Sequence, residues 1–219
     1  MKLALSSACL IPIAALFVAC DDGATGIALD FEPATTTSAL TLATDFEATR
    51  LEALVSEIKI LPDKDPVTEE KDDKFKAKGD FWIDALDPED SIIPTIPLSA
   101  NTYKKVEFKF DKPKSGSGID GTDAAIALDA TIDGVKVALR LGATEKVTLR
   151  DVSGIALASG GTSTFLVELD VPSWFDGVDV TTLDVGTDGV ALIDSKTNKA
   201  AYDTIAANVL SAIKLARKP

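Results

Sequence analysis

The sequence predicts an all-β protein, an antiparallel β-sandwich that ends in a short C-terminal helix. Short runs of alternating apolar and polar residues recur along the chain, and Asp-Gly and other glycine-containing turns separate them. Such a succession of strands favours an antiparallel sandwich over a parallel sheet. With 219 residues, of which 46% are hydrophobic, the chain can build a substantial core. We expect residues 38–219 to form one domain.

The clearest strands flank a tight turn. Two alternating runs in Ala124–Leu141 surround Asp133-Gly134, the preferred pair for a two-residue type I′ hairpin. Tyr103–Asp111 alternates strictly, which would place Tyr103 on the same face as the charged residues of that strand. Two further segments read as strands with one apolar face each: Glu145–Arg150 and Ser163–Val171.

Three other segments are harder to assign. In Arg50–Leu61, apolar residues stand at the i, i+3, i+4, i+7 spacing of a helix, although the resemblance described below implies a strand, which we adopt. Pro62–Asp80 mixes both charges and is expected to be a solvated loop. Tyr202–Lys218 reads as a helix with Asp203 as its cap and an apolar stripe that includes Ile205 and Val209.

Composition excludes several classes of function. The 35 acidic against 22 basic residues give a net charge of −13, which argues against nucleic-acid binding because phosphates require a basic face. The chain has no histidine, so Ser-His-Asp and Cys-His catalysis and imidazole metal sites are ruled out. Cys9 lies in the leader, so Cys20 has no partner for a disulfide or a zinc-thiolate site. We expect no metal, no cofactor and no catalytic residues.

The first residues look like a leader. Leu3–Ala19 follows Lys2 without a single charge, about the length of a signal peptide. Phe17–Cys20 resembles the lipobox of bacterial lipoproteins, in which a small residue such as Ala19 precedes an acylated cysteine. A plain secretory leader and a short uncleaved anchor are the alternatives.

The lipobox resemblance implies a specific organisation. We expect residues 1–19 to be a lipoprotein signal peptide, Cys20 to carry the acyl chains, and residues 20–37 to be a flexible tether. Two or three acyl chains meet the need for more than one lipid in stable anchoring. The domain would then be exported and held in the bacterial cell envelope, with membrane and leaflet left open.

Several phrases, in order, resemble a family of bacterial lipid-anchored β-sandwich lipoproteins of unknown function. Together they cover most of residues 50–214: Val55–Ile60, Gly79–Leu86, Ile96–Lys114, Leu166–Val180 and Ile205–Lys214. The resemblance implies an immunoglobulin-like or prealbumin-like sandwich. It transfers no catalytic residues.

Candidate sites have competing interpretations. Trp82 and Trp174 could stack on sugar rings, but packing in the core is the favoured interpretation. Calcium sites are one interpretation of three acidic segments: Asp84–Asp90, Phe175–Val180 and Asp184–Gly189. These segments lack the EF-hand spacing, and their composition is typical of turns. The leading prediction is a non-catalytic binding or structural module that is held at the membrane by Cys20 and faces an envelope glycan or protein. The alternative is a glycan-acting hydrolase with a carboxylate pair, or a carbohydrate-binding module.

Overall fold

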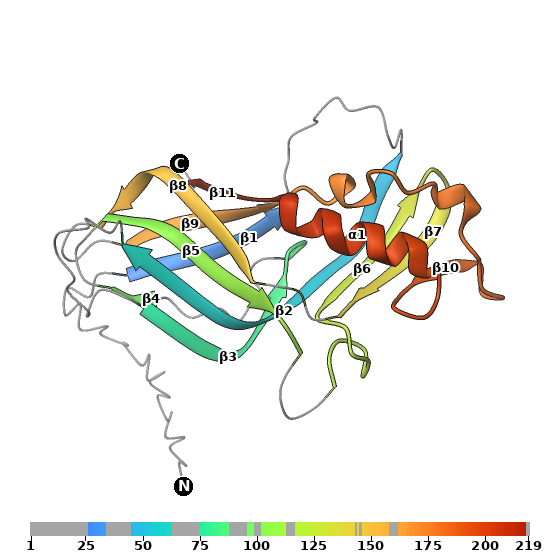
Figure 1. Ribbon diagram of the computed structural model, residues 1–219, viewed down its shortest axis with the longest axis horizontal. Helices are drawn as coiled ribbons and strands as arrows, with labels where there is room; N and C mark the ends of the chain where they lie inside the picture. Colours follow the sequence, from blue (N-terminus) through green and yellow to red (C-terminus); the bar gives the residue numbers. More distant parts are fainter. Residues whose placement is uncertain are drawn as a thin grey trace, which may run out of the picture.

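The computed structural model describes residues 26–33, 45–62, 75–87, 96–98, 102–112, 117–142, 144, 146–157 and 162–217. Within these residues, eleven strands form two mixed β-sheets, and one α-helix, α1 (Lys199–Ser211), packs against the larger sheet (Figure 1). The predicted all-β class with a helix near the C-terminus is confirmed.

The smaller sheet contains the first and the last strand. Its order is β11 (Ile213–Arg217), β9 (Thr162–Leu169), β1 (Gly26–Pro33) and β4 (Ile96–Pro97). β1 and β9 run parallel and pair at eight successive positions. Since β1 falls within the predicted tether of residues 20–37, that prediction is wrong for residues 26–33, which belong to the sheet.

The larger sheet is built around one long strand, β2 (Phe46–Pro62). β6 pairs with the first part of β2, β5 pairs with the last part, and β3 pairs with the middle. The sheet order is β10 (Val190–Ile193), β7 (Val135–Leu141), β6 (Ile126–Ile132), β2, β5 (Thr102–Phe110) and β8 (Val147–Ala156), with β3 (Phe75–Asp84) attached to β2. β3 begins inside the segment predicted to be a loop. β7 and β10 run parallel, as do β1 and β9 in the smaller sheet, so the prediction of purely antiparallel sheets is wrong.

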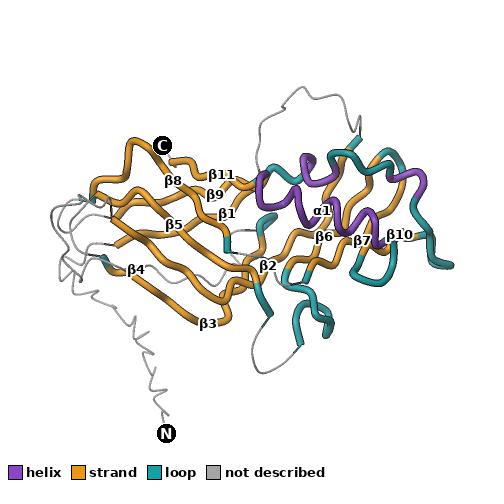
Figure 2. Tube along the Cα trace, viewed as in Figure 1, coloured by secondary structure: helices purple, strands orange, loops and turns teal. Residues whose placement is uncertain are grey.

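The core lies between the sheets and under the helix. Phe31 of β1 meets Phe108 of β5 edge to face, with ring centroids 5.5 Å apart, so the two sheets face each other. At the other end, α1 lies over β7 and β10 (Figure 2) and buries Ile205 and Val209. The hydroxyl of Tyr202 on α1 accepts a hydrogen bond from Gly142 N at 3.3 Å and ties the helix to the end of β7.

The hairpin and the strand assignment at residues 50–61 are both confirmed. Asp133 and Gly134 have φ of 48° and 79°, as a type I′ turn requires. In β2 the register shifts between Val55 and Glu57, which changes which alternate positions face the core. Leu51 and Val55 are buried before the shift, and Ile58 is buried after it. This bulge produces the spacing that imitates a helix.

A second bulge corrects the predicted faces of β5. The pairing of β5 with β8 shifts between Tyr103 and Lys105. Tyr103 is therefore fully buried together with Val106 and Phe108, rather than sharing the face of the charged residues.

The C-terminal helix is displaced from its predicted position. α1 begins after Asn198, whose φ is 51°, and the side chain of Asn198 makes no cap hydrogen bond. Asp203 lies inside the helix and pairs with Lys199, so the predicted cap is wrong. The chain then leaves the helix, and Ile213–Arg217 forms β11 on the edge of β9. Pairing with a distant strand overrides the helical spacing of this segment.

Candidate functional site

Trp174 is a core residue. It lies in a short 3-10 helix, η2 (Pro172–Phe175), with only 1% of its surface exposed, so no indole face is available to a sugar. Asn208 of α1 donates hydrogen bonds from Nδ2 to the carbonyl oxygens of Trp174 (3.1 Å) and Asp176 (2.9 Å), which joins the helix to η2. The indole Nε1 has no hydrogen-bond partner among the described residues.

Trp82 is packed less deeply. It lies on β3 and is partly buried. It covers a small cluster separate from the main core, made of Leu54, Ile119, Ala124 and Ala127. The structure therefore does not bring the two tryptophans together in one core cluster.

The acidic segments hold turns. Asp84 Oδ1 accepts hydrogen bonds from the backbone N–H groups of Leu86 and Asp87, at 3.0 and 3.1 Å. Asp179 Oδ1 accepts from Thr181 N at 3.0 Å and caps a short 3-10 helix, η3 (Val180–Thr182). Over the described ranges, no group of three or more acidic or cysteine side chains could hold a metal ion. Residues 88–90 of the first acidic segment lie outside those ranges.

A cavity of about 430 Å³ lies where β7 and β10 meet the loop that precedes β10. Two carboxylates, those of Asp184 and Asp188, line it beside the apolar side chains of Ala138, Val190 and Leu192. Both acidic residues are exposed, and Asp188 Oδ1 accepts a hydrogen bond from Val190 N at 3.1 Å. Both carboxylates face solvent, whereas the general acid of a glycoside hydrolase is enclosed in its pocket. Nothing in this cavity selects hydrolysis.

One ion-pair network crosses the outer face of β2, β6 and β7. Arg50 holds Asp120 with two hydrogen bonds of 2.9 Å, and also reaches Glu52. Arg140 contacts Asp120 at 3.0 Å and Asp129 at 2.7 Å. The hydrogen bonds from Arg50 lower the pKa of Asp120, and the neighbouring acids raise the pKa of Arg50. The two arginines and three acidic side chains of this network pair with one another. They link β2, β6 and β7 and so stabilise the sheet.

A second charged network lies on the outer face of β2, β3 and β5 and extends to Lys146, which directly precedes β8. We call it the lysine face, and it consists of Lys59, Lys76, Lys78, Lys105 and Lys146 around Glu57 and Glu107. The register pairs Lys59 with Glu107 on one side and with Lys76 on the other, so the side chains project from neighbouring positions of one face. Sequence reasoning missed this cluster, although the alternating charges around Glu107 were visible along β5.

Glu57 holds one half of the lysine face. Its Oε1 lies 2.5 Å from Nζ of Lys59, and its Oε2 lies 2.9 Å from Nζ of Lys76. The hydrogen bonds from these two lysines lower the pKa of Glu57 to about 2. Lys78 Nζ is farther away, at 3.8 Å. The pKa of Lys59 is raised, chiefly by its hydrogen bond to Glu57.

Glu107 holds the other half of the lysine face. Among the described residues it is the one charged residue that is buried, with 5% of its surface exposed. Burial acts to raise its pKa, but hydrogen bonds from Lys105 and Lys146 outweigh burial and lower it. Lys146 Nζ lies 3.0 Å from Oε2, and Lys59 Nζ lies 3.7 Å from the same oxygen. Glu107 is therefore an ionised anchor that fixes three ammonium groups.

The predicted lipidation residue, Cys20, and the leader lie outside the described residues. Where the structure is described, no helix is long and apolar enough to cross a bilayer.

Comparison with known proteins gives no relative. No family model, no curated protein and no solved structure matches this chain. The resemblance to lipid-anchored β-sandwich lipoproteins therefore stays a prediction.

Proposed function

We propose that this protein is a membrane-anchored lipoprotein of the bacterial cell envelope. Acyl chains on Cys20 hold a non-catalytic β-domain that binds, or contributes to the architecture of, envelope glycan or protein. The arrangement of a lipobox-like segment directly before the domain carries the proposal: β1 begins at Gly26, so only residues 21–25 separate the cysteine from the sheet. At about 3.5 Å per residue, such a link reaches roughly 20 Å at most.

The non-catalytic role is supported by how the charged residues are used. Acidic side chains at the candidate sites serve turns or ion pairs, as Asp84 and Glu107 illustrate. The contact between Phe31 and Phe108 across the two sheets supports a sandwich, and the proposed immunoglobulin or prealbumin type rests on the family resemblance. The hydrolase and carbohydrate-module alternatives have less support, because Trp174 is buried and the carboxylates that line the cavity are exposed.

Fractionation of cells that express the wild type and Cys20→Ala tests the anchor. The wild type is expected in the membrane fraction, and the variant is expected to be released or left unprocessed. A wild type found in the soluble fraction would overturn the anchor.

Titration with a glycan panel and with Ca²⁺, followed by thermal unfolding, tests the binding role, because a specific ligand raises the apparent stability. A glycan that raises the unfolding temperature supports a binding module. No shift with any glycan leaves an architectural role as the remaining form of the proposal.

A further inference from the structure

The lysine face is a basic surface on an acidic protein. Its five lysines exceed its two glutamates by three charges, whereas the whole chain carries −13, so the remainder carries −16. A charge distribution this uneven directs one side of the molecule toward anions and the other sides away from them.

The lysines outnumber the carboxylates that hold them. Lys76, Lys78 and Lys146 keep 45%, 63% and 50% of their side chains exposed. Each ammonium group has three donors, and one ion pair leaves donors that point to solvent. Glu57 and Glu107 hold these side chains in place, so an incoming anion meets an array that is already ordered.

Three lysines of the lysine face lie near the end of the domain where β1 begins, whereas Lys146 directly precedes β8, whose first residue pairs with Phe108 farther along β5. In Figure 1, β1 starts at the end where β2 finishes and where β3 and β5 start. The register agrees, because Ile60 pairs with Phe75 and Leu61 pairs with Lys105. Lys59, Lys76 and Lys105 are therefore all within a few residues of that end.

We propose that the lysine face docks on the phosphate headgroups of anionic phospholipids in the membrane that holds Cys20. This inference rests on the anchor proposed above, since an acylated Cys20 keeps the start of β1 within roughly 20 Å of that surface. A broad sheet face with several ammonium groups matches a planar array of phosphates. Lysines near an anionic bilayer each add to the attraction, which decays within a Debye length.

Vesicle flotation tests the docking surface without the acyl chains. Full chains that carry Cys20→Ala are mixed with vesicles of phosphatidylcholine alone or of phosphatidylcholine with phosphatidylglycerol, and the ratio of bound fractions is measured. Every variant keeps the same leader and the same segment 63–74, which carries six acidic and three basic residues. Differences between variants therefore report on the substituted lysines.

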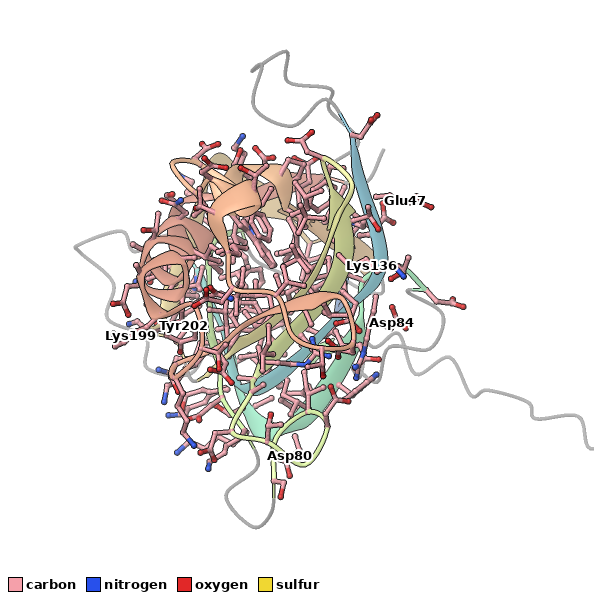
Figure 3. The ribbon with its side chains drawn as sticks, turned by 90° about the vertical axis from the view of Figure 1, so that its right-hand side faces the viewer. Glu47, Asp80, Asp84, Lys136, Lys199 and Tyr202 are labelled. Atoms are coloured by element: carbon pink, nitrogen blue, oxygen red, sulfur yellow. The ribbon has the colours of Figure 1, made fainter. Side chains whose placement is uncertain are left out.

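The face variant is Lys76→Glu, Lys78→Glu and Lys146→Glu. The matched control, Lys136→Glu, Lys196→Glu and Lys199→Glu, changes the net charge equally; Lys136 and Lys199 are labelled in Figure 3 at the end of the molecule that holds β7 and α1. At about fivefold per lysine, loss of three lowers the preference for anionic vesicles by roughly 100-fold, and the control is expected to lose far less. High salt should abolish the wild-type preference.

Three results would overturn the docking surface: a wild type without preference for anionic vesicles, an equal loss in both triple variants, or binding of soluble inorganic polyphosphate without any vesicle preference. If the glutamate variant is unfolded by circular dichroism, glutamine at the same three positions replaces it and the same outcomes decide. If mass spectrometry finds an acylated Cys20 but the vesicle preference is absent, only the docking surface is rejected. If the vesicle preference is present but Cys20 is unmodified, only the anchor is rejected.

Discussion

Replacing Trp174 by alanine tests whether this residue is a core residue. Its side chain is 1% exposed, and truncation of a buried tryptophan lowers the free energy of unfolding by about 3–5 kcal/mol. The wild type also carries a buried indole N–H with no partner among the described residues, a defect of about 1 kcal/mol that alanine removes. The expected net loss is about 2–4 kcal/mol.

Denaturant unfolding followed by far-UV circular dichroism measures this loss independently of tryptophan fluorescence. Trp82→Ala is the matched control, because Trp82 is only partly buried on a satellite cluster, and it should lose about 1–2 kcal/mol. Trp174→Phe keeps an aromatic ring and removes the unpaired N–H, so it should remain within about 1 kcal/mol of the wild type. A smaller loss for Trp174→Ala than for Trp82→Ala would refute the reasoning.

Other consequences concern the two ion networks and the helix. Arg140→Ala should lower the free energy of unfolding by about 1–3 kcal/mol, because Asp120 and Asp129 lose a shared partner. The control Lys199→Ala removes an exposed ion pair and should lower it by less than about 0.5 kcal/mol. Similar losses for the two variants would contradict the structural role of Arg140. Because the folded pKa of Glu57 is lowered from 4.5 to about 2, its stabilisation is present above pH 4.5 and lost as the pH falls toward 2. Glu57→Gln should therefore show a shallower decline of the unfolding temperature in this window, and parallel curves would count against the ion pairs. Asn208→Ala removes two hydrogen bonds to η2, so amide hydrogen exchange in α1 should accelerate, with a loss of about 1–2 kcal/mol; unchanged exchange would contradict that link.

Local signals were sufficient for part of the fold. Asp133-Gly134 specifies its turn through backbone conformations that these two residues tolerate, so the hairpin is readable from the sequence. The bulges after Val55 and Tyr103 are not readable in this way, because a single extra residue changes which side chains are buried without changing composition.

Distant pairing decided the rest. Gly26–Pro33 pairs with β9 along its whole length, and its alternating Ile27, Leu29 and Phe31 were hidden in the sequence by the small polar residues on either side. Ile213–Arg217 continues an apolar stripe typical of a helix, but the same strand, β9, draws it into the sheet. The lysine face likewise combines residues of three strands with Lys146, which directly precedes a fourth, and only the alternation around Glu107 within β5 was visible along the chain. Prediction from one sequence sees such local patterns and not the partners that complete them.

The most direct test of the central claim is the mass of the N-terminal peptide of the protein isolated from bacterial membranes. The account predicts a peptide that begins at Cys20 and carries two or three acyl chains, with residues 1–19 removed. A peptide that retains the leader, or one that contains an unmodified Cys20, would contradict the account.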